Sequence, residues 1–242
     1  MVLSIDRYEE TIKQLNKWKK KMQKKPSVIN KASKGVQGKL NNMLPEKYHQ
    51  IITGTIKSMI KGVLLGSQIT TKKAYPPMSL EEKEKLVREK VKVYKTASII
   101  EGVGTGAGGL LMAMADFPLL ISIKIKLLYD IASIYGFDIK DYQERIYILN
   151  IFQLTFSSQG GVNDVFAKMN DWDNYSKILP KDLNLLDWRT LQQEYKDYID
   201  LAKLMQIIPG IGAVVGGYTN AKLLDKLGET AMNSYRMRIF KD

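Results

Sequence analysis

A dense group of cationic side chains surrounds one tryptophan near the N-terminus. Its members are Lys17, Trp18, Lys19, Lys20, Lys21, Lys24 and Lys25. Apolar residues recur three or four positions apart over residues 5–22, which predicts an amphipathic helix with this tryptophan on its apolar face. Such helices bind anionic membranes, where each nearby lysine contributes about 1 kcal/mol. We therefore expect the lysines to face anionic lipid, with Trp18 at the headgroup boundary.

The positive charge is concentrated in the first 100 residues. The chain has 37 Lys and Arg against 25 Asp and Glu, a formal net charge of +12. Residues 1–100 hold 22 of the basic and 8 of the acidic residues, whereas residues 101–242 hold 15 and 17. This distribution indicates a polyanionic partner, either nucleic acid or the inner membrane surface. The alternative is a solvated basic face that only aids solubility. Single-strand binding also uses exposed aromatic rings, and this half has few, so the membrane is favoured.

The composition excludes several kinds of site. The chain has no cysteine and a single histidine, His49, which rules out thiol nucleophiles, cysteine zinc sites and multi-histidine metal centres. We expect no metal and no cofactor. No signal peptide is recognised at the N-terminus, so we expect a cytoplasmic protein. The oligomeric state is left open.

A glycine-rich run covers residues 101–109. Gly104, Gly106 and Gly109 fit the dinucleotide pattern G-x-G-x-x-G, but that pattern needs a preceding strand, and a charged helix is expected there. Small residues four apart, Gly104 with Gly108 and Gly212 with Gly216, instead favour two glycine-rich apolar helices packed closely together. The same helices could open toward lipid or hold a ligand between them.

Carboxylates close to this run raise the alternative of acid–base catalysis. A hydrolase would need a polar cleft that brings together at least two of Glu101, Asp116, Arg145 and Asn220. Asp116 is more simply the N-cap of a helix, and no G-x-S-x-G elbow is present. The protein is therefore interpreted as non-enzymatic, with a membrane-proximal hydrolase kept as the alternative.

The elements that must position these residues are all helices. Apolar periodicity and capping signals predict helices over about 5–22, 48–64, 80–100, 117–135, 142–156, 187–205 and 209–240. Ser79 with Glu82, and Asp141 with Glu144, have capping-box spacing, and Gly136 closes the fourth helix. Residues 160–187 are expected to be irregular, with at most one short helix. The expected fold is an all-α bundle in which a basic N-terminal segment (1–78) packs on or flanks a core (79–242), with little or no β-structure. No segment clearly meets the length and apolarity of a membrane-spanning helix.

Several segments of the core resemble the EcsC family of bacterial proteins. The resemblance lies in Met114-Ala-Asp-Phe-Pro-Leu, in the helix that ends at Tyr135-Gly136, in Glu144-Arg145-Ile-Tyr, in the stretch Ile207 to Asn220, and in a closing segment with Arg236 and Arg238. The signature positions are Asp116, Pro118, Tyr135, Gly136, Arg145, Pro209, Gly212, Gly216 and Asn220.

The resemblance implies a link to an ABC exporter, whose ATPase and membrane subunits are encoded in the operon that gives the family its name. It supplies no catalytic residues to carry over. Together with the charge, it predicts an accessory protein that binds peripherally to the cytoplasmic face of the membrane and supports that exporter. The alternatives are the hydrolase and, less favoured, a nucleic-acid-binding protein.

Overall fold

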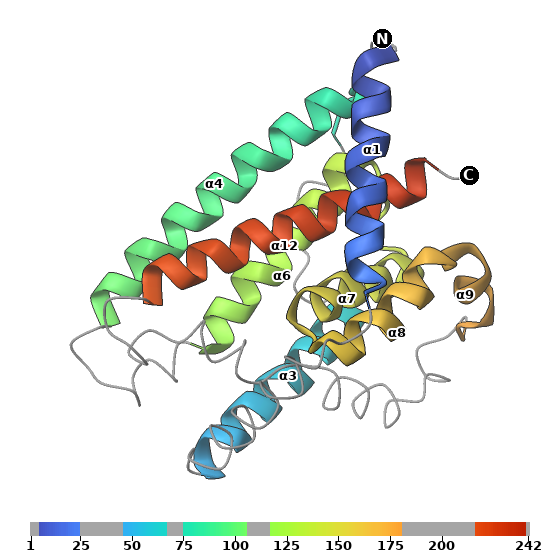
Figure 1. Ribbon diagram of the computed structural model, residues 1–242. Coiled ribbons are helices and arrows are strands. Elements are labelled where there is room, and N and C mark those ends of the chain that lie inside the picture. Colours follow the sequence, from blue (N-terminus) through green and yellow to red (C-terminus); the bar gives the residue numbers. More distant parts are fainter. Residues whose placement is uncertain (1–4, 25–45, 67–74, 106–116, 181–215, 241–242) are drawn as a thin grey trace.

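A computed structural model describes residues 5–24, 46–66, 75–105, 117–180 and 216–240 (Figure 1). These ranges contain α1 (Ile5–Met22), α3 (Glu46–Leu65), α4 (Leu80–Thr105), α6 (Phe117–Tyr135), α7 (Tyr142–Phe156), α8 (Gln159–Asn170), α9 (Trp172–Ile178) and α12 (Gly216–Ile239). They contain no β-strand. The predicted all-α bundle is confirmed.

The start of α4 and the end of α6 lie where the capping residues predict them. The Ser79 backbone amide donates to Glu82 Oε2 at 2.8 Å and the Glu82 amide donates to Ser79 Oγ at 3.3 Å, a capping box that begins α4. Helix α6 ends at Tyr135 because Gly136 takes a φ of +92°, which few residues other than glycine adopt. The amides of Gly136 and Phe137 then donate to the carbonyls of Ser133 and Ala132, which is a Schellman motif.

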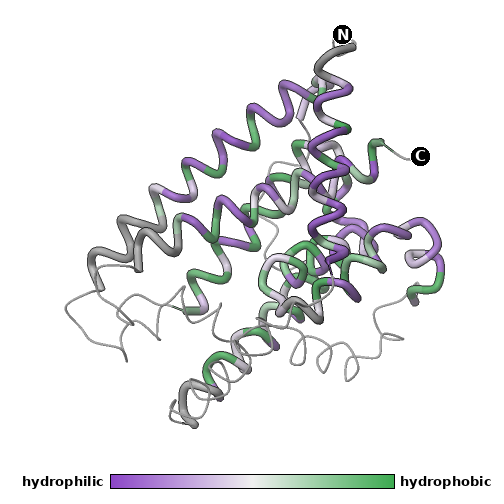
Figure 2. The backbone as a smooth tube through the Cα atoms, in the orientation of Figure 1, coloured by the Kyte–Doolittle hydropathy of each residue, from purple (hydrophilic) through white to green (hydrophobic). Residues whose placement is uncertain are grey.

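The core is built around α6. Helix α6 packs against α4 and α12 on one side and against α3 and α7 on the other. The long helices α4 and α12 lie side by side, and α1 crosses α12 near its C-terminal end (Figure 1). Figure 2 shows hydrophilic residues along much of the two outer helices α1 and α4.

The basic N-terminal part shares this core. Leu15 on α1 and Ile52, Ile60 and Val63 on α3 are buried with the apolar residues of α6 and α7. The Tyr129 hydroxyl on α6 donates to the Val63 carbonyl at 3.1 Å. The boundary at residue 78 stays a prediction. None of the described helices combines the length and apolarity that crossing a bilayer requires.

The structure differs from the sequence prediction over residues 160–187. The prediction that residues 160–187 are mainly irregular is wrong, because α8 and α9 occupy residues 159–178. Val162, Val165, Phe166 and Met169 are buried along one side of α8, and this packing stabilises a helix in an otherwise polar segment. The expected helix over 187–205, residues 106–109 of the first glycine-rich run and residues 207–215 of the second glycine-rich stretch lie outside the described residues.

A cationic groove as candidate anion-binding site

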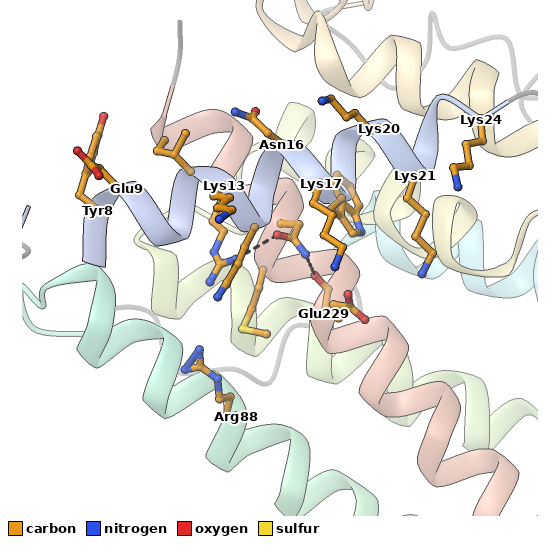
Figure 3. A pocket seen from close by; sticks show the side chains of 16 residues that line it. Tyr8, Glu9, Lys13, Asn16, Lys17, Lys20, Lys21, Lys24, Arg88 and Glu229 are labelled. Carbon is orange, nitrogen blue, oxygen red and sulfur yellow. Dashed lines mark hydrogen bonds between the residues drawn. The ribbon is translucent and has the colours of Figure 1, made fainter. Parts of the chain in front are cut away.

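A groove of about 1100 Å³ lies between α1, α4 and α12 (Figure 3). Its cationic lining residues are Lys13, Lys17, Lys20, Lys21 and Lys24 from the α1 segment, Arg88 from α4 and Arg236 from α12. Glu9 and Glu229 are the acidic residues of the lining. Cations therefore outnumber carboxylates, and the groove attracts anions.

The lysines of α1 share one exposed face because of their spacing. Each residue turns an α-helix by about 100°, so Lys13, Lys17, Lys20 and Lys21 fall within roughly a 100° sector of α1. All four side chains are exposed. Lys24 follows just beyond the end of the helix. We call Lys13, Lys17, Lys20 and Lys21 the cationic face of α1.

The bottom of the groove holds a buried arginine. Arg236 Nε donates to Glu84 Oε1 at 2.6 Å and Nη2 donates to Glu84 Oε2 at 2.7 Å, a bidentate pair with both side chains buried. Arg236 Nη1 donates to Asn233 Oδ1 at 3.2 Å. Glu84 also accepts a hydrogen bond from Arg88 Nη2 at 3.1 Å. This network fixes the position of the Arg236 guanidinium and orients Arg88 toward the groove.

The apolar face of α1 is turned toward the protein. Trp18 is 6% exposed and its ring meets that of Phe166 on α8 edge to face, with centroids 5.8 Å apart. Leu15 is 2% exposed, and Tyr8 contacts Phe240. The expectation that Trp18 sits at a lipid headgroup boundary is therefore wrong for this conformation, because Trp18 is buried against Phe166 of α8.

The lysine cluster of the sequence divides in the structure. Lys19 lies on the opposite side of α1 from the cationic face, where it lines a smaller cavity of about 230 Å³ together with Asp171 and Asp173. Lys25 lies outside the described residues. Of the seven residues in that cluster, Lys17, Lys20, Lys21 and Lys24 are cations brought together at the groove, where the buried Trp18 forms part of the wall.

Comparison with known proteins identifies the family. The profile of the EcsC protein family matches residues 9–240. The chain is 46% identical over 226 residues to Protein EcsC of Bacillus subtilis (strain 168), and this match covers 93% of each protein. The chain belongs to the EcsC family. It is also 32% identical over 142 residues to the uncharacterized protein YdbA of the same strain, which covers 59% of this chain and 52% of YdbA. No solved structure shows a significant match.

The EcsC signature positions in the described residues serve mainly to end helices and pack the core. Pro118 is in the first turn of α6, and its carbonyl accepts from the Ser122 hydroxyl. Tyr135 stacks on Tyr235 with centroids 5.1 Å apart, ahead of the Gly136 turn. Arg145 Nη1 donates to the Lys140 carbonyl at 2.7 Å at the start of α7.

The remaining signature positions, and the candidate pocket residues Glu101, Gly104 and Gly108 of the glycine-rich run, are described by their backbone alone or lie outside the described residues. Glu101 and Gly104 lie on α4, and Gly216 and Asn220 on α12, by their backbone alone. Gly108, Asp116, Pro209 and Gly212 lie outside the described residues. The catalytic cleft required by the hydrolase alternative is therefore not tested. Within the described ranges, no three His, Asp or Glu side chains gather as a metal site would require.

Sequence reasoning missed a second buried charge cluster, which joins Glu144 to Tyr235 and Arg238. Asp141 caps α7 as predicted, since its side chain accepts from the Gln143 amide at 3.1 Å. Glu144 does not complete that capping box. It points into the core, where it accepts from the Tyr235 hydroxyl at 2.7 Å and pairs with Arg238. Burial raises the pKa of Glu144 and the Arg238 guanidinium opposes that shift.

Lys124 on α6 is a further buried ionisable group. The side chain is fully buried, and Nζ donates to the Leu120 carbonyl at 3.4 Å. Removal from water lowers the pKa of Lys124 to about 7. Its spacing in the sequence gave no signal for this, because a lysine within an apolar helix is ordinarily expected to reach the surface.

Proposed function

We propose that this EcsC protein is a non-enzymatic accessory protein that binds peripherally to anionic phospholipid at the cytoplasmic face of the bacterial membrane. The observation that carries the proposal is the cationic face of α1, where four lysines are exposed on one side of a single helix. In this proposal the protein supports an ABC exporter, and that part rests on the family resemblance alone.

The binding is electrostatic in this proposal. At about 1 kcal/mol for each lysine near an anionic surface, three lysines contribute up to about 3 kcal/mol. Even half of that total changes the affinity by about tenfold. Because Leu15 and Trp18 on the apolar face of α1 are already buried in the protein, the proposal requires no insertion of Trp18. Binding should therefore weaken with salt, since mobile ions screen exposed charges.

Co-sedimentation with vesicles tests the proposal. We expect binding to vesicles that contain phosphatidylglycerol and none to pure phosphatidylcholine. The variant K17Q/K20Q/K21Q should bind the anionic vesicles at least about tenfold more weakly. The control K57Q/K61Q/K126Q removes the same net charge from three exposed lysines on α3 and α6, and should retain most of the binding.

Three results would overturn the proposal. Equal binding to neutral vesicles would show that charge does not drive association. Equal losses in the two triple variants would show that only the net charge matters, not the cationic face. Displacement from anionic vesicles by a short DNA duplex at equal phosphate concentration would favour the nucleic-acid alternative.

A further inference from the structure

The groove places cations on facing walls. Lys13, Lys17 and Lys21 extend from α1, and Arg88 stands on α4 across from them (Figure 3). Arg236 lies between these walls, held by Glu84. A flat membrane surface can touch the outer side of α1, but only a group that enters the groove can contact both walls at once.

The chemistry of these cations suits phosphate. A guanidinium offers a planar fork of N–H donors that matches two phosphate oxygens, and lysine adds a mobile point charge. Arg236 is buried and held by Glu84, while its Nη1 donates to Asn233 Oδ1 at 3.2 Å and to Gln14 Oε1 at 3.5 Å. The exposed Arg88 and the lysines of α1 are therefore the cations that an anion entering the groove meets first. The groove volume of about 1100 Å³ is slightly larger than that of ordinary ligand sites and far larger than one phosphate fills.

The length of the cation row points to more than one phosphate. Lys13 and Lys21 are eight residues apart on α1, which is about 12 Å along the axis at 1.5 Å per residue. A single phosphate contacts one part of this row. Two phosphates joined by a short neutral linker reach both parts, with Arg88 on the opposite wall.

The two carboxylates of the lining add selectivity. Glu9 and Glu229 repel an evenly charged polymer laid along the groove, such as a nucleic-acid strand. They tolerate a neutral linker, and a hydroxyl on that linker can donate to a carboxylate. A glycerol bridge between two phosphates has this character.

We propose that the groove binds a bisphosphate headgroup of the diphosphatidylglycerol type, and this proposal rests on the membrane docking proposed above. The cationic face supplies general attraction to anionic lipid. The groove supplies a preference for one headgroup, because its facing cations engage both phosphates.

Vesicles of matched charge separate the two proposals. One set contains phosphatidylglycerol in phosphatidylcholine, and the other contains half as much diphosphatidylglycerol, so that the charge per unit of surface is equal. The full chain should bind the second set at least about fivefold more tightly. The variant R88Q should lose this preference and keep its affinity for phosphatidylglycerol within about twofold.

Lys85 provides the matched control. It is an exposed cation on α4, three residues before Arg88, and does not line the groove. K85Q should therefore retain the preference. Because the Arg88 side chain is 56% exposed and Glu84 keeps its pair with Arg236, R88Q should melt within a few degrees of the unmodified protein.

Each contrary outcome has a distinct meaning. Equal binding to both vesicle sets would overturn the headgroup proposal and leave the docking proposal standing, whereas binding to neither would overturn both. Loss of preference in K85Q as in R88Q would show that the groove is not the site. Millimolar pyrophosphate that binds the protein through Arg88, without any vesicle preference, would reassign the groove to a soluble phosphate ligand.

Discussion

Arg236 both lines the groove and closes a buried ion pair. Burying a guanidinium and a carboxylate carries a desolvation cost that good geometry offsets only in part, so the intact pair adds little net stability. Breaking it is expensive because one charge is left buried without its partner. The short bidentate contacts to Glu84, and the added bond to Asn233, therefore serve to fix the side chain in place.

This argument predicts unequal effects of single and double variants. R236M should lower the free energy of unfolding by about 3 kcal/mol, because Glu84 then keeps only the exposed Arg88 as a partner. The double variant E84M/R236M should recover most of that loss. Urea unfolding followed by circular dichroism measures both, and losses that simply add would contradict the argument. R88Q removes an exposed contact and should cost less than about 1 kcal/mol.

Local spacing in the sequence predicts which residue caps a helix, but it does not predict side-chain partners that are distant in the chain. Asp141 and Glu144 have the spacing of a capping box, and Asp141 does cap α7. Glu144 turns inward because Tyr235 and Arg238, more than 90 positions away in the chain, offer its carboxylate stronger partners. Glu84 and Arg236 are 152 positions apart. No pattern in a single sequence indicates such pairs.

At the scale of helices, the predictions succeeded where periodicity and caps agree. The bounds of α1 and the end of α6 follow from apolar spacing and from Gly136. The prediction of a mainly irregular segment failed at α8 and α9, although apolar residues with helical spacing are present there. Val162, Val165, Phe166 and Met169 have helical spacing and are buried.

Gly228 allows α4 and α12 to approach closely. A Cβ added at Gly228 would lie 2.6 Å from Val91 Cγ2, and the branched valine has little freedom to move away. G228A should therefore destabilise the protein by about 1–3 kcal/mol. The measurement is thermal or urea unfolding.

Gly54 on α3 is the matched control. Nothing in the described chain comes within 4 Å of a Cβ added there. Because alanine favours a helix over glycine, G54A should stabilise the protein by about 0.5–1 kcal/mol. A neutral or stabilising G228A would mean that α4 and α12 are farther apart than described.

At the scale of the whole molecule, the sequence could not predict what covers the apolar face of α1. An amphipathic helix satisfies the same hydrophobic requirement by packing on lipid or on its own protein, and the sequence pattern is identical in both cases. In this chain the helix packs on its own protein, because Trp18 contacts Phe166 and Tyr8 contacts Phe240. The lysines of the cationic face nevertheless remain exposed to solvent. The expectation that they face anionic lipid therefore keeps a physical basis, whereas the expectation for Trp18 does not.

Docking without release of α1 has a measurable consequence. A protein that retains only Trp18, made by W172F/W188F, should bind anionic vesicles, while lipids brominated in their acyl chains leave its fluorescence unchanged. The reason is that the indole stays against Phe166, inside the protein. A free amphipathic helix at the same membrane would bring its tryptophan within the range of bromine quenching. Strong quenching of Trp18 on vesicles, absent in K17Q/K20Q/K21Q, would mean that α1 leaves α8 and α12 upon binding. In that case the groove lined by α1 and α12 would be a feature of the unbound protein alone.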